Sequence, residues 1–194
     1  MKRLFVVMGV TVFLCACNNE EYTPKPKGYF RIELQKKDYV PVTSDDYPFT
    51  FEIPSVSYTI EVSKNNKDTK SDWLDIYYPF YKARIYCTYT PVNRHNFREA
   101  AEDSYRFVYR HTVKADAIEE NPFAYPQKRI YGILYTLSGN TASPVQFTVT
   151  DSTKHFFRGA LYFDGCTPNQ DSLKPVINYI SDDIAHIIST FRWK

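Results

Sequence analysis

The chain is poor in glycine and lacks a long uninterrupted apolar segment. Only six of its 194 residues are glycine, and neither GxGxxG nor GxxxxGK[ST] occurs. Both nucleotide-binding motifs need glycine-rich loops whose backbone amides contact phosphates. A membrane-spanning helix needs about 20 consecutive apolar residues, and no stretch reaches that length. The sequence therefore predicts neither a nucleotide-binding loop nor a transmembrane helix.

Recognisable catalytic and metal-binding motifs are also missing. There is no GxSxG nucleophile elbow and no pair of histidines with the spacing of HExxH. Isolated histidines are more often structural residues than ligands, and here the four are His95, His111, His155 and His186. The sequence therefore predicts no catalytic residue, no cofactor and no metal site.

Adjacent acidic residues occur at Asp45–Asp46, Glu119–Glu120 and Asp182–Asp183. Acid–base catalysis needs two carboxyl groups that face each other across a substrate. Neighbours in a helix do not face each other, so we expect the last pair to line the solvent side of the final helix. None of these pairs indicates an active site, and we expect a protein that is not an enzyme.

What the N-terminus does have is the pattern of a lipoprotein signal peptide. Lys2 and Arg3 precede an apolar stretch, residues 4–14, of the length typical of such signals. Leu-Cys-Ala then precedes Cys17 as in a lipobox, where a small residue allows cleavage and the thiol receives the lipid. The alternative is an ordinary secretory signal with a chance cysteine. We predict lipidation of Cys17.

Lipidation at Cys17 would hold the protein at a membrane through its acyl chains. Two or three chains exceed the two-signal threshold for stable anchoring. The residues that follow are polar and include two prolines, which favours an extended tether. The expected organisation is a signal peptide over residues 1–16, the lipidated cysteine and tether over 17–27, and one domain over 28–194.

The charge of the mature part is balanced. Removing Lys2 and Arg3 from the 24 basic residues leaves 22 basic against 22 acidic residues. A nucleic-acid-binding surface needs clustered excess lysine and arginine. We therefore expect no nucleic acid partner, and no small-molecule substrate is evident.

Two cysteines, Cys87 and Cys166, remain beyond the lipobox. An oxidising periplasm permits a disulfide between them. Two separate buried thiols are an equal alternative, because cysteine packs as a small hydrophobe. Without companion histidines, the pair does not predict a zinc site.

Aromatic residues are abundant, with 17 Tyr, 14 Phe and 2 Trp. Their concentration in alternating segments fits their preference for β-strands. A stacking platform for a glycan or for a protein partner is the functional alternative.

Hydrophobic periodicity divides the chain into strands and two helices. The period of three to four predicts one helix over residues 94–113, with Asn93 as its N-cap. A second helix is expected with Asp171 or Ser172 as its cap and Pro175 in its first turn. Two prolines predict a loop over residues 115–126. The expected strands are residues 28–34, 49–53, 57–63, 73–78, 82–90, 128–137, 145–150 and 155–163.

This order of elements predicts an α+β domain, an antiparallel sheet with two main helices packed on it. The closing strand, turn and amphipathic helix over residues 159–191 resemble the PsbP/Mog1-like α/β/α sandwich. Such a similarity of fold carries no function.

A basic, proline-containing segment close behind the anchor is a candidate interaction segment. Its prolines favour an extended conformation, and its basic side chains would lie near the membrane surface. The alternative is a linker followed by an edge strand. The segment consists of Pro24, Lys25, Pro26, Lys27, Gly28, Tyr29, Phe30 and Arg31.

The run YTPKPKGYFRI at residues 22–32 is similar to the start of the gliding motility lipoprotein GldD family of Bacteroidota. The end of the chain resembles that family too, through RGALYF at 158–163, NQDSLKPV at 169–176 and residues 180–193. The resemblance covers essentially the whole chain. It implies an envelope lipoprotein needed for gliding and type IX secretion, with no established enzymatic activity and no defined site.

The leading hypothesis is an envelope lipoprotein that acts by contact with other gliding or secretion proteins. A glycan- or peptidoglycan-binding module is one alternative, and an envelope hydrolase whose site is not visible in the sequence is another. No aspartate follows Cys17 directly, which favours the outer membrane, with the domain facing the periplasm.

Overall fold

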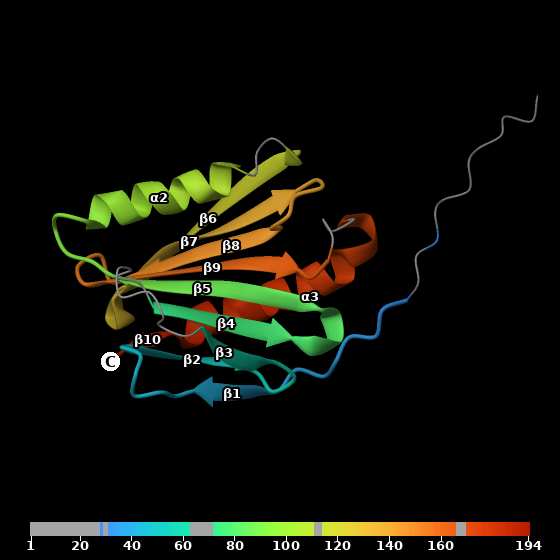
Figure 1. Ribbon diagram of the computed structural model, residues 1–194, viewed down its shortest axis with the longest axis horizontal. Helices are drawn as coiled ribbons and strands as arrows, with labels where there is room; N and C mark the ends of the chain where they lie inside the picture. The colour runs from blue at the N-terminus through green and yellow to red at the C-terminus, as the bar shows by residue number, and fades with distance from the viewer. Residues whose placement is uncertain (1–27, 29–30, 63–71, 111–113, 166–169) are drawn as a thin grey trace, which may run out of the picture. The chain divides into compact units, whose positions relative to one another are not determined.

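The structure, a computed structural model, describes Gly28 and residues 31–62, 72–110, 114–165 and 170–194. The chain divides into two compact units, Met1–Phe30 and Arg31–Lys194. Gly28 is the only residue of the first unit that the structure describes. The second unit contains every helix and strand discussed below (Figure 1).

A seven-stranded antiparallel sheet forms the centre of this unit, in the order β3-β4-β5-β9-β8-β7-β6. Strands β6 to β9 are neighbours both in the chain and in the sheet, so they form a meander. Short connections between antiparallel strands allow this arrangement. The strands are β3 (Tyr58–Val62), β4 (Asp72–Tyr78), β5 (Ala83–Pro91), β6 (Ala117–Tyr125), β7 (Ile130–Ser138), β8 (Val145–Thr150) and β9 (His155–Phe163).

A smaller sheet joins segments from both ends of the unit. Its central strand, β2 (Phe49–Pro54), pairs with β1 (Tyr39–Val42) on one side and with β10 (Arg192–Trp193) on the other. All three strands run antiparallel to their neighbours. Neither β1 nor β10 was expected from the sequence, because four- and two-residue segments are too short to show a period.

Alternation along the strands gives the large sheet two different faces. In β5, for example, Ile85 and Cys87 are buried in the main core, whereas Tyr86 between them is exposed. The same core takes in Phe147 of β8 and Phe157 of β9. The sheet therefore has one face that is closed by the core and an opposite face that remains partly open.

Helix α3 (Gln170–Thr190) closes the buried face. Its apolar stripe packs into the main core and consists of Val176, Ile177, Ile180, Ile184, Ile187 and Ile188. Pro175 was expected in the first turn of this helix. Because the helix begins at Gln170, Pro175 instead lies beyond the first turn. The cap expected at Asp171 or Ser172 is wrong for the same reason, since both residues are already helical.

Helix α2 (Phe97–Tyr109) lies on the opposite face of the sheet. Val108 packs there against Tyr135 and Leu137 of β7 in a second, smaller core. The helix starts three residues later than predicted. The Asn93 side chain instead accepts hydrogen bonds from the backbone amides of His95 and Asn96, at 2.8 and 3.3 Å. Helices on both faces confirm the α+β fold with an antiparallel sheet between two main helices.

The prediction of a loop over residues 115–126 is wrong. The segment 115–126, expected as a loop, forms the edge strand β6. Proline is tolerated at a sheet edge because only one side of the strand is paired, and Pro122 lies opposite Ile133. Gly132 allows this strand to pack closely, since a Cβ there would lie 2.5 Å from the Phe123 ring.

The strand expected over residues 28–34 is absent from the part of it that the structure describes, Gly28 and residues 31–34. Ile32 packs against the main core while Leu34 is exposed. The alternating pattern in this part of the sequence therefore belongs to an irregular segment on the surface of the domain. One residue further on, the backbone amide of Gln35 donates to the Tyr81 hydroxyl at 2.9 Å. Side-chain contacts therefore replace a strand partner here.

The last acidic pair also differs from expectation. Asp182 is exposed, but Asp183 is completely buried. Both side chains were expected to face solvent. Successive helical residues, however, point about 100° apart, so only one of them does. Asp183 therefore needs internal partners, and it has them in Lys37 and Tyr39.

Candidate functional site

A cleft of about 670 Å³ lies between α2 and the open face of the sheet. Its floor comes from β4, β5 and β9, and its wall comes from the first turns and the middle of α2. This volume falls in the range of about 300–1,000 Å³ that is usual for ligand sites. The cleft is therefore the part of the described structure with the clearest capacity to hold another molecule.

Strand register places the floor residues in two neighbouring rows. One row runs from Asp75 through Tyr86 and Ala160 to Gln146. The next row runs from Trp73 through Thr88 and Arg158 to Thr148. Small Ala160 lies between two larger residues of its row, and Ala100 of α2 also lines the cleft. The hollow is thus made by small side chains between large ones.

Aromatic side chains form the mouth of the cleft. Trp73 is 52% exposed, Tyr86 45% and Phe107 of α2 44%. Tyr86 meets Tyr162 edge-on, with ring centroids 5.5 Å apart, and Phe156 contributes to the lining from β9. Exposed aromatic rings of this kind favour contact with apolar surfaces.

The aromatic surface continues past the cleft towards β3. Tyr58 and Tyr77 pack edge-on with centroids 5.5 Å apart, and the Arg84 guanidinium lies 5.1 Å from the Tyr77 ring. These side chains share the face of Trp73 and Tyr86 by register. We call the five residues of this surface the open aromatic face: Tyr58, Trp73, Tyr77, Tyr86 and Tyr162.

Arg158 is the main charged group in the floor of the cleft. Its Nη2 donates to Gln146 Oε1 at 2.9 Å, and its guanidinium lies 4.5 Å from the centre of the Phe107 ring. Its Nε is buried and finds no acceptor among the described residues. Burial lowers the pKa of Arg158, with only a small opposing effect of Tyr162. The guanidinium nevertheless stays charged, because its pKa starts so high.

Three carboxylates surround the cleft. Asp75 is buried in the floor and pairs with Arg84, whose Nη1 lies 3.2 Å away. Burial raises the pKa of Asp75, and the hydrogen bond from Arg84 opposes this. Glu99 and Asp103 lie on α2, where Asp103 pairs with Arg106. The acidic groups therefore lie at the edges of the cleft or are already paired.

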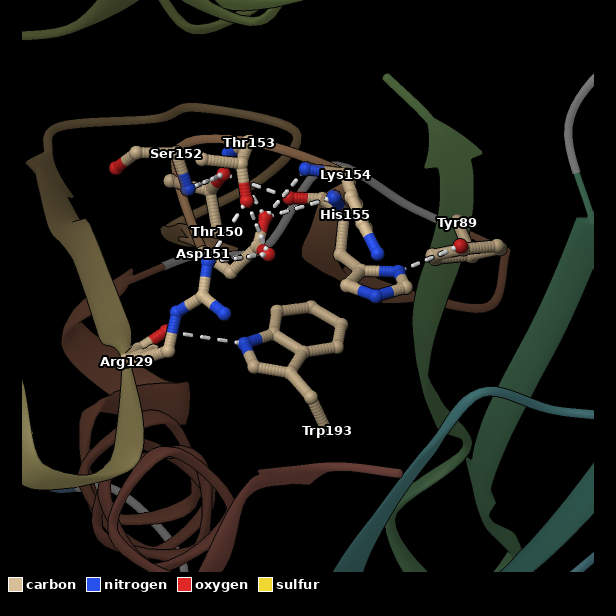
Figure 2. A network of polar contacts seen from close by, with 9 residues as sticks. All are labelled: Tyr89, Arg129, Thr150, Asp151, Ser152, Thr153, Lys154, His155 and Trp193. Carbon is tan, nitrogen blue, oxygen red and sulfur yellow. Dashed lines mark hydrogen bonds and ion pairs between the residues drawn. The ribbon is translucent and has the colours of Figure 1, made fainter. Parts of the chain in front are cut away.

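A second polar cluster lies at the β8–β9 turn, away from the cleft (Figure 2). Asp151 accepts hydrogen bonds from the backbone amides of Thr153, Lys154 and His155, at 2.7 to 2.9 Å. Burial raises the pKa of Asp151, but the bonds from Thr153 and these amides outweigh it and lower the pKa. The backbone donors come from the turn itself, and from outside it Arg129 Nη2 lies 3.5 Å from Asp151 Oδ2. The cluster therefore stabilises the hairpin.

Comparison with known proteins decides the family. The family described as "Gliding motility lipoprotein GldD" matches residues 19–193. The chain belongs to the gliding motility lipoprotein GldD family. The family resemblance expected from the sequence is thereby confirmed. Comparison with curated proteins gives no match.

Among solved structures, the chain is similar to the solution structure of cyanobacterial PsbP (CyanoP) from Synechocystis sp. PCC 6803. The two share 11% sequence identity, with a TM-score of 0.48. The alignment covers 85% of this chain and 98% of the other.

Most of the residues singled out in this GldD-family sequence lie outside the described part. They are Cys17, Pro24, Lys25, Pro26, Lys27, Tyr29, Phe30 and Cys166. Of the interaction segment, the structure describes Gly28 and an exposed Arg31. Cys87 is a buried thiol in β5 whose pKa is raised by burial. A disulfide between Cys87 and Cys166 stays a prediction.

The histidines of the described part are placed apart. His155 contacts Tyr89 and Trp193, His186 contacts Glu52, and His95 is exposed. His111 lies outside the described residues. Within the described part of the chain, no group of three His, Cys, Asp or Glu residues could hold a metal ion. Nor does any helix of that part have the length and hydropathy of a membrane span.

Sequence reasoning missed the cleft. Its residues come from β4, β5, α2 and β9, which are separated by up to 89 positions between Trp73 and Tyr162. The only local signal was the lone arginine at position 158 within an otherwise apolar strand, HFFRGALYF. An isolated charge at a strand position that should be buried is a reason to look for a partner.

Proposed function

We propose that this chain is a non-enzymatic envelope lipoprotein that supports the gliding and type IX secretion machinery by protein–protein contact. Its contribution would be to the assembly or stability of that machinery. The observation that carries the proposal is membership of the gliding motility lipoprotein GldD family over residues 19–193. The proposed partners are other gliding and secretion proteins of the envelope.

The open aromatic face is the proposed contact surface. Three of its rings, those of Tyr58, Trp73 and Tyr86, are between 45% and 52% exposed. Tyrosine and tryptophan are enriched at the energetic centres of protein interfaces. Arg84 lies over Tyr77 and Tyr86, and arginine is enriched there as well. The segment Pro24–Arg31 is proposed as a second contact, close to the anchor.

The proposed location is the periplasmic side of the outer membrane. A lipid on Cys17 would hold the protein there, and the tether over residues 17–27 would separate the lipid from the domain that starts at residue 28. A chain of about ten flexible residues has a root-mean-square span of roughly 16–19 Å. The domain would therefore act on partners within a few nanometres of the membrane surface.

The test is in-membrane crosslinking of the tagged lipoprotein, followed by affinity purification and a secretion assay. We expect secretion or motility subunits to be recovered. Trp73→Ser combined with Tyr86→Ser should reduce both this recovery and secretion, while the lipoprotein level stays normal. Phe80→Ser is the matched control, since Phe80 is 60% exposed but does not line the cleft. Intact secretion in a deletion strain, with no subunit recovered, contradicts the proposal.

A glycan-binding role is the second candidate, and the cleft is the observation that favours it. Exposed Trp73 and Tyr86 lie beside the polar side chains of Asp75, Asn96 and Glu99. Aromatic rings with neighbouring hydrogen-bonding groups suit sugars. Sedimentation with purified peptidoglycan distinguishes the two roles. Binding that Trp73→Ser abolishes would favour the glycan module, and its absence favours protein contact.

A further inference from the structure

Some polar atoms at and behind the base of the cleft are buried without a hydrogen-bond partner in the described part of the chain. Ser104 of α2 is 4% exposed and Gln146 of β8 is completely buried. The Ser104 hydroxyl, the Gln146 Nε2 and the Arg158 Nε are all buried, and none has a partner in the described part of the chain. Buried polar groups are paired in most proteins. Arg158 is the only charged side chain of the three.

The same place has an uncompensated positive charge. The one hydrogen bond of Arg158 goes to a neutral amide, Gln146 Oε1, and no carboxylate of the described residues pairs with the guanidinium. A half-buried charge without a counter-ion is unfavourable. The nearby acidic groups are engaged elsewhere or lie on the rim, since Asp75 pairs with Arg84 and Asp103 with Arg106. An anion that enters the cleft would supply the missing counter-charge.

The surroundings of Arg158 determine what kind of molecule carries that anion. Phe107, Phe156, Ala100 and Ala160 make the inner walls apolar. The mouth is aromatic, and Glu99 adds negative charge to its rim, whereas Asp103 is paired with Arg106. Like charges repel, so the rim disfavours a compact dianion such as phosphate. A single negative group on an apolar body fits both the base and the walls.

We propose that the cleft binds a carboxylate carried on an apolar or aromatic body, with Arg158 as its ion-pair partner. Gln146 is a positioning residue that orients the guanidinium through its Oε1. The carboxylate has two sources of the same chemistry, a free amphiphilic acid or the carboxyl terminus of a peptide with an apolar last residue. This proposal is independent of the secretion role.

Calorimetric titration of the purified full-length lipoprotein tests the ligand. The probes are N-acetyl-phenylalanine, its C-terminal amide and inorganic phosphate. We expect the acid to bind, the amide to bind at least about tenfold more weakly, because a hydrogen bond to a charged group contributes that much, and phosphate not to bind. Equal binding of acid and amide, or no binding of the acid at millimolar concentration, overturns the proposal.

Variants of the chain test the site. Gln146→Glu has nearly the same shape and gives Arg158 a permanent carboxylate, so the fold should be kept while binding of the acid falls at least about tenfold. Arg158→Gln should lose binding as well. The control is Arg98→Gln, which removes an exposed arginine of α2 outside the cleft lining. Undiminished binding in Gln146→Glu, with unfolding unchanged, contradicts the role of Arg158.

A last comparison separates the two sources. Octanoate represents the free amphiphilic acids, and N-acetyl-Ala-Ala-Phe represents a peptide terminus. Tighter binding of the peptide, weakened by Trp73→Ser at the mouth, identifies a protein carboxyl terminus. Tighter binding of octanoate, weakened by the cleft-filling change Ala100→Trp, identifies a free acid. Secretion assays do not enter this comparison, so its failure leaves the proposed function untouched.

Discussion

Asp183 is a completely buried carboxylate near the middle of α3. Lys37 lies 3.1 Å from it, and the Tyr39 hydroxyl donates to it at 2.9 Å. Burial raises the pKa of Asp183, and the hydrogen bonds from Lys37 and Tyr39 oppose that effect. Asp151 shows the opposite balance, because three backbone amides stabilise its charge. The pKa of a buried carboxyl group thus depends on which hydrogen-bond donors the surrounding chain provides.

Replacing Lys37 should be more damaging than its surface location suggests. Lys37→Met leaves the buried Asp183 without its counter-ion, and we expect the free energy of unfolding to fall by about 3 kcal/mol. Asp183→Asn should cost less, because Lys37 is partly exposed and keeps Asp182 and the Tyr179 carbonyl as partners. Urea unfolding measures both changes. If the free energy of unfolding falls no further in Lys37→Met than in Asp183→Asn, Lys37 is not the counter-ion that the buried Asp183 needs.

His155 should make stability depend on pH. Its Nδ1 lies 2.8 Å from the Tyr89 hydroxyl, and its ring stacks on Trp193 at 4.8 Å (Figure 2). Burial lowers the pKa of His155, and Asp151 opposes this. The folded protein therefore binds this proton less readily than the unfolded chain does. The stabilisation is complete above the ordinary histidine pKa of about 6.5 and is lost as the pH falls below it.

The measurement is the unfolding temperature at pH 7.5 and at pH 5.5. We expect it to drop at the lower pH, and the drop to shrink in His155→Gln, which cannot titrate. His95→Gln serves as the control, since His95 is exposed and its replacement should leave the difference unchanged. An equal drop in His155→Gln and the native chain would rule out His155 as the cause.

Among the elements, β2 connects the two ends of the folded unit. It pairs with β1 on one edge and β10 on the other, and its Phe49 and Phe51 stack on Phe191. β10 has two residues, too few for stability by pairing alone. Its Trp193 compensates by packing edge-on against Phe49 and by donating its indole N–H to the Arg129 carbonyl at 3.2 Å. Trp193 thus adds side-chain contacts to the backbone pairing of β10 with β2, and the backbone amide of Lys194 donates to the Pro48 carbonyl at 2.9 Å.

Trp193→Ala should therefore lower the free energy of unfolding by about 2–3 kcal/mol, through lost ring contacts and a cavity at the end of the core. Arg192→Ala, in the same strand but exposed, should change it by less than about 0.5 kcal/mol. Chemical denaturation of both variants checks this. Similar losses in the two variants would mean that backbone pairing, and not the indole, fixes β10.

At the scale of the whole molecule, the expected anchor and the cleft define how the protein would work. If a signal peptide is removed after residue 16, the remaining chain has 22 basic and 22 acidic residues, and this balance gives no net electrostatic attraction to a membrane or a nucleic acid. A lipid would then be the means of localisation, and the partly open sheet face would be free to meet a partner. A lipid anchor combined with an open sheet face is consistent with a family described as gliding motility lipoproteins.

The anchor is tested by replacing the two lipobox cysteines separately. Cys17→Ser should abolish incorporation of labelled palmitate and move the protein out of the membrane fraction, because the thiol is the acceptor of the lipid. Cys15→Ser keeps Ala16 before Cys17 and should be lipidated normally. Labelling that persists in Cys17→Ser and disappears in Cys15→Ser would relocate the cleavage site.

Much of the secondary structure was predictable from the sequence because it depends on local periodicity. The stripe of isoleucines in α3 and the alternation in β5 and β9 identify their elements without further information. β6 was not predictable, since Pro122 is a reason against a strand unless the strand is known to lie at an edge. The same holds for β10, whose existence depends on contacts with Phe49 and Arg129.

Periodicity and motifs are properties of neighbouring residues, so the α+β class, the two helices and the family could be predicted from the sequence. Which polar groups are buried together depends instead on how distant segments pack. Pairing of β4, β5, β9 and β8 places Asp75, Gln146 and Arg158 on one face, and α2 then adds Ser104 and Phe107. A cleft depends on contacts between distant segments, and no pattern within any one of them contains that information.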